Sequence, residues 1–528
     1  MPGGAMVAPS IFNDVLGPVM RGPSSSHCAA ALRIGRLARD LMDAHVTWAR
    51  VEVDPRGSLA TTHTSQGSDM GLAGGLLGWD ATDPRLPDYA AELDRAGLRV
   101  EWVVADLGPL GARHPNTYKL TLRSAHELHT LVALSTGGGA IEVIRIDGCP
   151  VSIPGDGYET LLYLDGDAQA LARDLSDRPE VDAVLAHHGP NVALVELRSQ
   201  RPLGADAVQM AATEHAVRST KHLSPVLPIL TPPHLTLPYL TCAEMRAYNE
   251  GRGLDLGELA VRYECARSGL EPDQVLAKMV EIVCLLRSSI RAGVRGTSYA
   301  DRILGPQAPG FQRAMERDAL LEGGILNRVI LYVTALMEAK SALKTIVAAP
   351  TAGACGALPG ACLAATEALG RSEQDAARAM LAAGLIGVFI AHRSTFAAEE
   401  CGCQAECGAA SGMAAAALVT LAGGRAGQAA AAASMALQNV IGLVCDPVAN
   451  RVEVPCLGRN VMAASNALAC ANMALAGYDP VIPLDEVIAA MDEVGRCLPA
   501  ALRCTALGGL SVTPTSQAIA ARLESEAF

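Results

Sequence analysis

Residues 272–293, PDQVLAKMVEIVCLLRSSIRAG, indicate the fold of this chain most directly. Their apolar residues recur at the spacing of one helix face, namely Val275, Met279, Ile282, Val283, Leu286 and Ile290. Pro272 suits the first turn of a helix, because the N–H that proline lacks would have no partner there. Gly293 can end the helix. The stretch therefore predicts one long amphipathic helix.

Similar Ala-rich segments occupy much of the following sequence, at 325–346, 358–369, 374–391, 408–422, 427–444 and 459–476. Half of the 528 residues are hydrophobic but only 3% are aromatic, so the apolar content is mainly aliphatic. Ala dominates it and has the highest helix propensity. The most apolar stretches, near 408–424 and 429–445, contain polar residues and Gly, and we interpret them as buried helices rather than membrane spans. Residues 236–528 are therefore predicted to form a mostly α-helical C-terminal domain.

The sequence before this region has a mixed pattern. Short runs typical of strands stand at 51–53, 100–104, 118–122 and 141–146. Residues 1–157 are therefore predicted to form an α+β N-terminal domain. Residues 158–200 predict a small βαβ module that resembles half of an amino-acid-sensing ACT unit. Five prolines interrupt residues 201–235, which predict a linker.

Charge and cysteine content restrict the function. The formal net charge is −13, and no run of Lys and Arg supplies the basic face that nucleic acid or an anionic membrane would need. We expect neither partner. Residues 1–14 lack a basic segment followed by a long apolar stretch, so we expect no signal peptide and a cytoplasmic protein. The 15 cysteines are then expected to be reduced thiols, some of them available as metal ligands.

Three cysteine-containing segments lie in the helical region. They are CGCQAEC at 401–407, CDPV at 445–448 and VPCLGRN at 454–460. Thiolates in turns broken by Gly and Pro are natural ligands of a soft metal or an iron–sulfur cluster. However, there is neither a ferredoxin-like run nor a zinc-finger pair, and buried structural cysteines would give the same spacing. The spacing alone leaves both interpretations open.

Several motifs follow one another along nearly the whole chain. They are GPSSSH at 22–27, GSLA at 57–60, HPN at 114–116, GGG at 137–139, PTAGACG at 350–356, GCQ at 402–404, CDPV at 445–448, PC at 455–456, RN at 459–460, and Thr505 with GGL at 508–510. With these motifs the chain resembles the iron–sulfur-dependent L-serine dehydratases (L-serine deaminases), with a β-like and an α-like unit fused in one chain. The resemblance implies a lyase that converts L-serine, a small amino acid, to pyruvate and ammonia, in amino-acid degradation and gluconeogenesis. It also implies a helical catalytic domain and a cytoplasmic homodimer.

The same resemblance implies the cofactor and its ligands. Cys403, Cys445 and Cys456 would hold a four-iron, four-sulfur (4Fe-4S) cluster and leave one iron open. That iron would act as a Lewis acid on the substrate hydroxyl and carboxylate. In some members a C-terminal cysteine caps the open iron, but Cys504 is the last cysteine of this chain, so no such flexible tail is expected.

The resemblance also implies the residues that act on the substrate. His27 with Ser25 and Ser26 is the catalytic candidate, because an imidazole titrates near neutral pH. Without the resemblance, the SSSH sequence would predict only a turn with a capping serine. The substrate-binding candidates are Ser24, His63, Asp69, Asn116, Thr351 and Arg393.

Some positions depart from the family pattern. SQGSD at 65–69 stands where many members carry Gly-His-Gly-Thr-Asp, Ala352 replaces an Asn, and residues 393–400 replace a different polar stretch. Arg393 could pair with a second substrate carboxylate, so the same chemistry on a 3-hydroxy-dicarboxylic amino acid is an alternative. An ion pair of Arg393 with Glu399 or Glu400 is the structural explanation. A non-catalytic metal-containing amino-acid sensor is the alternative from another class.

Other candidates lead to structural expectations only. The GGG run at 137–139 lacks the Lys-Ser/Thr pair of a phosphate-binding P-loop. His187 and His188 are expected in a turn between two strands. The remaining cysteines are expected to pack in the core, including Cys28, Cys149, Cys265, Cys284, Cys355, Cys362 and Cys470.

Overall fold

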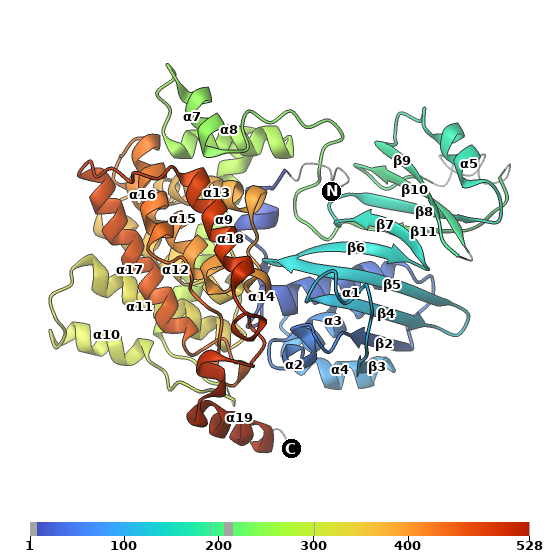
Figure 1. Cartoon of the computed structure of the whole chain (residues 1–528), viewed down its shortest axis with the longest axis horizontal. Helices are drawn as coiled ribbons and strands as arrows, with labels where there is room; N and C mark the ends of the chain where they lie inside the picture. The colour runs from blue at the N-terminus through green and yellow to red at the C-terminus, as the bar shows by residue number, and fades with distance from the viewer. Residues whose placement is uncertain (1–7, 191, 205–214, 300, 527–528) are drawn as a thin grey trace. The chain divides into compact units, whose positions relative to one another are not determined.

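The computed structural model describes residues 8–190, 192–204, 215–299 and 301–526. The chain divides into two compact units (Figure 1). The helical unit comprises the chain up to Ser25, Gly137–Gly139 and the chain from Thr236 onward. The α+β unit comprises Ser26–Thr136 and Ala140–Leu235. The predicted combination of an α+β N-terminal part with a helical C-terminal part is confirmed in outline.

The helical unit is built mainly from helices that surround α15. Its main elements are β1 (Val19–Met20), α7 (Cys242–Asn249), α8 (Leu256–Ser268), α9 (Pro272–Val294), α10 (Ala308–Glu316), α11 (Ile325–Ser341), β12 (Ile346–Val347), α12 (Ala357–Ala368), α13 (Glu373–Arg393), α14 (Ala398–Cys401), α15 (Cys407–Leu421), α16 (Ala426–Gln438), α17 (Cys456–Leu475), α18 (Leu484–Cys497) and α19 (Pro514–Glu526). α15 packs against α12, α13, α16 and α17. Nearly all of its residues are buried, and most are Ala or Gly, so the neighbouring helices approach it closely.

The predicted helices of this unit are confirmed. α9 begins at Pro272, and the six apolar residues of its predicted face are all buried. The six Ala-rich segments form α11, α12, α13, α15, α16 and α17. α11 ends at Ser341 rather than near 346, because Ile346 and Val347 pair with β1. α16 ends at Gln438 rather than near 444, and Gly442 in the following turn has a φ of +90°. α15 and α16 are buried helices, as expected.

Within the described ranges, one helix, α13, is long and apolar enough to span a bilayer by length and composition alone. Of its most apolar window, 78% is buried inside the protein, as in the core helix of a globular fold.

The residues before Ser26 belong to the helical unit, whereas the sequence predicted them as part of the α+β domain. The buried carboxylate of Glu264 on α8 accepts hydrogen bonds from the Ser10 hydroxyl (2.6 Å) and the Ile11 N–H (2.8 Å). The short helix η1 (Ile11–Val15) packs against α13. These contacts join residues about 250 positions apart, so a local pattern could not predict them.

The α+β unit contains a six-stranded sheet in the order β3-β2-β4-β5-β6-β7. Its strands and helices are α1 (Ala30–Asp40), β2 (Trp48–Val53), α2 (Leu59–Thr62), α3 (Ser68–Leu76), α4 (Tyr89–Ala96), β3 (Arg99–Val104), β4 (Thr117–Arg123), β5 (Leu128–Gly137), β6 (Ala140–Ile146) and β7 (Cys149–Ile153). β2 pairs in parallel with β3 and antiparallel with β4. The inward residues Ala49, Val51 and Val53 of β2 share one core with Leu37 of α1.

Helices α1 and α3 cross at very short distance. A Cβ atom at Gly71 would lie 2.0 Å from the carbonyl oxygen of Cys28, and one at Gly75 would lie 2.1 Å from that of Leu32. Both positions therefore require glycine. The crossing fixes the backbone at Cys28, directly after His27.

A second sheet of the α+β unit corrects the predicted module and linker. It has the order β11-β8-β10-β9, formed by β8 (Tyr158–Leu164), β9 (Ala183–His188), β10 (Ala193–Ser199) and β11 (Val217–Leu223), with helix α5 (Ala168–Leu175) after β8. Strand β11 lies inside 201–235, the predicted linker, and pairs antiparallel with β8. The prolines that suggested a linker lie outside this strand, which buries Lys221 and Leu223.

Two smaller expectations were wrong. His187 and His188 end strand β9 rather than forming a turn, and His187 pairs with Glu196 of the adjacent strand at 2.9 Å. Cys284 is exposed and Cys265 only partly buried, whereas the other five cysteines expected in the core are buried. Cys284 lies on the exposed side of α9, and residue type alone does not distinguish an exposed cysteine from a buried one.

Candidate active site

Five cysteine side chains gather in the helical unit at the start of α15. Cys403, Cys407, Cys445 and Cys504 belong to one buried group of side chains. Cys456 is also buried, and its thiolate would interact electrostatically with those of Cys403 and Cys407. The three predicted cluster ligands are therefore brought together, although long loops and helices separate them in sequence.

Local structure explains how these thiols are presented. Cys403 begins the short helix η5 (Cys403–Ala405), directly after Gly402, whose φ of +71° suits glycine. Cys456 begins α17. Cys445 lies between α16 and α17, and its N–H donates to the carbonyl oxygen of Leu502 at 2.9 Å. Thiols at helix starts are favourable sites for negative charge and hence for metal-binding thiolates.

Two of the predicted ligands each contact another cysteine: Cys403 contacts Cys407, and Cys445 contacts Cys504. The Cys407 thiol donates a hydrogen bond to Cys403 and lowers the pKa of Cys403 to about 7, although burial opposes the shift. The nearby Arg459 guanidinium adds to this lowering. The contact with Cys504, followed by burial, raises the pKa of Cys445. Burial raises the pKa of Cys456. Cys403 is thus the thiol of the group that ionises most readily.

A carboxyl group and a hydroxyl lie beside these cysteines. The Thr351 hydroxyl donates to Oε1 of Glu406 at 2.6 Å, and Thr351 Oγ1 accepts from the Ala354 N–H at 3.2 Å. The Ser25 hydroxyl accepts from the Ala352 N–H at 3.2 Å. Burial, reinforced by Cys403, raises the pKa of Glu406 to about 8. Ser25 and Thr351, both predicted, therefore lie close together, and Glu406 carries a proton at neutral pH.

Asn460 and Arg459 hold the loops around the cysteines in place. Asn460 Oδ1 accepts from the Gly356 and Ala357 N–H groups, and its Nδ2 donates to Cys407 Sγ at 3.5 Å. Arg459 donates to the Val444 carbonyl oxygen and to Asp446, both at 2.7 Å. These side chains fix the start of α12 and the loop at Cys445.

The other predicted residues lie in the α+β unit, where His27 is fully buried. Its Nε2 lies 2.7 Å from the Thr62 hydroxyl, which donates to the Ser58 carbonyl oxygen at 2.7 Å. A hydroxyl that donates elsewhere is free to accept, so the contact favours a proton on Nε2. Ser26 is also buried, and its carbonyl oxygen accepts from the Ser135 hydroxyl.

His63 and Asp69 form a pair near the surface of the same unit. His63 Nδ1 lies 2.6 Å from Asp69 Oδ1, and the imidazole stacks on the Trp102 ring at 4.6 Å between centroids. Thr64 donates to the other Asp69 oxygen at 2.8 Å. Two of the predicted substrate-binding residues, His63 and Asp69, are therefore in direct contact.

Asn116 is the clearest unsatisfied polar group among the predicted residues. It is fully buried, and neither its side-chain oxygen nor its nitrogen has a hydrogen-bond partner within the described residues. A buried amide without partners costs stability, and such groups are retained where a ligand satisfies them. Asn116 is therefore suited to bind a ligand.

Two predicted residues remain outside these groups. Arg393 is exposed at the end of α13 and forms no ion pair among the residues described, so the expected structural pairing with Glu399 or Glu400 is absent. Glu400 pairs instead with Arg496 at 3.7 Å. Ser24 is partly buried.

Two further residues of the cysteine region, Glu406 and Lys340, were not predicted from the sequence. Glu406 stands between two cysteines in the quoted segment, which was a usable signal. Lys340 of α11 is fully buried, donates to the Val452 carbonyl oxygen, and its charge lowers the pKa of Glu406 and Cys456. An isolated Lys in an amphipathic helix gives no such signal.

The donor set fits an iron–sulfur cluster. It offers three buried thiols from separate segments, with the cationic Arg459 close enough to offset thiolate charge. Within the described ranges, no three His, Cys, Asp or Glu side chains are grouped tightly enough to bind a single metal ion. Ligands of a four-iron cluster bind different irons and are therefore spread apart. Cys403, Cys445 and Cys456 could hold such a cluster.

Comparison with known proteins agrees with this arrangement. The sequence model of the family described as "Serine dehydratase alpha chain" matches residues 244–511. The probable L-serine dehydratase alpha chain of Bacillus subtilis is 40% identical over 245 residues, which cover 46% of this chain and 82% of the relative. The L-serine dehydratase alpha chain of Peptoniphilus asaccharolyticus is 37% identical over 51% of this chain and 92% of its own length.

A further relative extends the similarity into the α+β unit. The L-serine dehydratase of Streptomyces coelicolor is 27% identical over 498 residues, 93% of this chain and 96% of its own length. The alpha-chain match covers the region that carries the five gathered cysteines, and the longer alignment covers both units. The chain therefore belongs to the iron–sulfur L-serine dehydratase family, whose alpha-chain part lies in its helical unit.

Proposed function

We propose that this chain is an L-serine dehydratase, a lyase that removes water from L-serine and releases pyruvate and ammonia. One observation carries the proposal: three buried thiols that could hold an iron–sulfur cluster lie beside the protonated Glu406 and its partner Thr351. Membership of the family supports the same activity.

Cys403, Cys445 and Cys456 are the proposed ligands of a 4Fe-4S cluster. When bound, a cluster with three protein ligands supplies a Lewis acid at its open iron, which makes hydroxide a better leaving group. The chain's own residues then handle the protons. Because the raised pKa keeps Glu406 neutral at pH 7, its Oε2 can give a proton to the departing hydroxyl. Thr351 orients the carboxyl by donating to Oε1.

Removal of the Cα proton needs a base. We assign this role to His27, because the family resemblance makes it the catalytic candidate and an imidazole can accept a proton near neutral pH. Ser24, Ser25 and Ser26 precede it and supply hydroxyls for the substrate carboxylate. Asn116, whose side-chain amide atoms have no hydrogen-bond partner among the residues that the structure describes, is proposed to bind the substrate. His63 and Asp69 are proposed as a further substrate-binding pair.

L-serine is the substrate that the family favours, and a 3-hydroxy-dicarboxylic amino acid remains the alternative. What supports the alternative is that Arg393 is exposed and unpaired among the described residues, so its guanidinium is available to a second carboxylate. The test is Arg393→Ala. An unchanged ratio of kcat/KM for L-serine and L-threo-3-hydroxyaspartate would exclude a role for Arg393 in substrate choice.

The four-stranded sheet of residues 158–223 is proposed to be a regulatory module. Its strand order, in which β8 and β10 occupy the middle and β9 and β11 the edges, supports the likeness to an ACT unit. A cytoplasmic location and a homodimer also remain predictions.

The deciding experiment is an anaerobic assay of iron-reconstituted protein with L-serine, with pyruvate, iron and sulfide measured in one sample. We expect about four irons and four sulfides per chain, with rapid pyruvate release. A fully loaded cluster without pyruvate would exclude L-serine as substrate. Zinc in place of iron and sulfide would exclude the proposed cofactor.

A further inference from the structure

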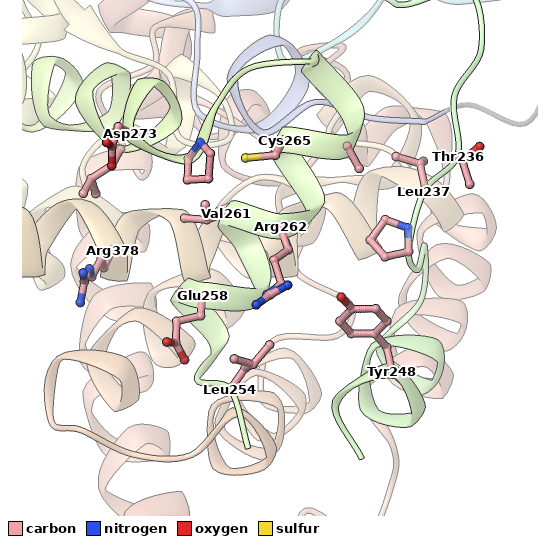
Figure 2. A pocket seen from close by; sticks show the side chains of 15 residues that line it. Thr236, Leu237, Tyr248, Leu254, Glu258, Val261, Arg262, Cys265, Asp273 and Arg378 are labelled. Carbon is pink, nitrogen blue, oxygen red and sulfur yellow. The ribbon is translucent and has the colours of Figure 1, made fainter. Parts of the chain in front are cut away.

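A groove in the helical unit lies over the outer face of α8 (Figure 2). Its volume is about 720 Å³, within the range of small-molecule sites in proteins. Helix α8 forms its floor, and the walls come from the segment at Thr236, from α7 and from the first turn of α9. No residue of this groove belongs to the proposed catalytic machinery.

The lining combines apolar surface with charges of both signs. Leu237, Leu254, Val261 and Leu276 provide aliphatic contacts, and the ring of Tyr248 lies at one end. Two guanidiniums, Arg262 and Arg378, and two carboxylates, Glu258 and Asp273, also line the groove. In Figure 2, Arg378 and Asp273 lie toward the end opposite Tyr248, and Arg262 lies between them and that ring.

Both guanidiniums are available to a ligand. Among the residues that the structure describes, neither Arg262 nor Arg378 has an ion pair or hydrogen bond, and Asp273 has no ion pair. Glu258 is already used in part, because its carboxylate accepts from the Asp255 N–H in the capping box of α8. Two positive and two negative side chains leave the groove without net charge, so a simple anion or cation would meet repulsion as well as attraction.

We propose that this groove binds a small zwitterion with an apolar body, either an aliphatic amino acid or a short peptide. Its carboxylate pairs with Arg378 or Arg262, because guanidiniums bind carboxylates through two parallel hydrogen bonds. Its ammonium pairs with Asp273, and its apolar side chain covers Val261 and Leu276. Free amino acids and peptide ends share this chemistry.

The opposite face of α8 gives this binding a route to the rest of the helical unit. Tyr263 donates to the Pro9 carbonyl oxygen at 2.7 Å, and Glu264 holds Ser10 and Ile11. One face of α8 lines the groove, and Tyr263 and Glu264 on another face hold the N-terminal segment. This segment continues along the chain to Ser25. A ligand that shifts α8 would therefore shift the segment that carries Ser25. This regulatory part rests on the proposed function, whereas binding itself does not.

Calorimetric titration of the holoenzyme tests the binding. The probes are L-leucine and L-leucyl-L-leucine, compared with 4-methylpentanoate, which lacks the ammonium, and 3-methylbutylamine, which lacks the carboxylate. We expect each half-ligand to bind at least about tenfold more weakly than its zwitterion. Tighter binding of the dipeptide identifies peptide ends as the source, and tighter binding of L-leucine identifies free amino acids.

Three variants place the ligand in the groove. Arg378→Gln and Asp273→Asn are expected to weaken L-leucine binding at least about tenfold, whereas Arg313→Gln, an exposed arginine on α10, should leave it unchanged. Equal affinity in all three variants, equal binding of 4-methylpentanoate, or no binding of either zwitterion would overturn the proposal. Pyruvate release without added ligand should be unchanged in Arg378→Gln, so failure of the groove and failure of the dehydratase assay are distinguishable.

Discussion

Glu264 should make the anchoring of the N-terminal segment depend on pH, and replacing it with Gln should remove that dependence. Burial raises the pKa of this fully buried carboxyl from 4.5 to about 7, although its bonds from Ser10 and Ile11 oppose the shift. Between pH 4.5 and about 7, the anchored state therefore keeps a proton that the released or unfolded state has lost. Stability must fall as pH rises through this window and level off above it.

The size of the effect follows from the two pKa values. At about 1.4 kcal/mol per pH unit, the difference between 4.5 and about 7 corresponds to about 3 kcal/mol at pH 8. Gln is the neutral counterpart of the carboxyl and keeps an oxygen that can accept from the Ile11 N–H. Glu264→Gln should therefore match the native chain near pH 5 and exceed its stability by up to about 3 kcal/mol at pH 8.

Hydrogen exchange of peptides covering residues 8–15 and α8 measures this difference directly, because it reports local opening in a protein with more than one unit. Native and variant proteins are compared at the same pH, so intrinsic exchange rates cancel. Ser10→Ala is the matched control: it removes a bond that lowers the pKa of Glu264 but keeps the carboxyl, so the pH dependence should remain. If the difference between Glu264→Gln and the native chain stayed constant from pH 5 to pH 8, the reasoning would be refuted.

Three further predictions concern other parts of the chain. Cys403→Ser should abolish iron and sulfide retention after reconstitution, whereas Cys407→Ser should retain most of both; iron analysis that ranked them equally would contradict the ligand assignment. Asn116→Ala should raise KM for L-serine about tenfold or more without lowering the melting temperature, because its side-chain amide has no hydrogen-bond partner to lose in the described part of the chain; a lowered melting temperature with unchanged KM would make it structural. Lys221→Met should cost roughly 1 kcal/mol in urea unfolding, because the buried ammonium pairs with Glu127 at 2.5 Å and with Asp43 at 2.7 Å, and Glu127 would keep only the Asp43 and Ala44 N–H donors; a neutral effect would mean that water replaces the ammonium at Glu127.

The helical half was predictable because its packing signal is local. The spacing from Val275 to Ile290 on α9, with Pro272 at its start, specifies both the helix and its buried face. The same holds for the alternation in β2, where Ala49, Val51 and Val53 point inward. Propensity and periodicity act over a few residues, so they remain visible in the sequence without knowledge of the fold.

Strand β11 and the N-terminal segment were missed for the opposite reason. Lys221 and Leu223 are buried by pairing with β8 and by partners such as Glu127, which are 50 or more positions away. Ser10 is held by Glu264, which is 254 positions distant. Prolines near 225–233 were a strong local signal, but the strand that precedes them depends on tertiary partners.

The candidate site also contains residues that their type suggests and residues whose role depends on burial. Cysteine spacing alone left metal ligands and structural cysteines both open, and the family resemblance of the motifs implied Cys403, Cys445 and Cys456 as the cluster ligands. Glu406 stands among the cysteines of the segment at 401–407, but its residue type predicts only an ionised carboxylate, because a Glu is ordinarily a surface residue. Burial, reinforced by the nearby Cys403, raises its pKa to about 8, so it carries a proton at neutral pH. Residue type thus reveals a possible metal ligand, whereas the protonation state of Glu406 depends on its surroundings.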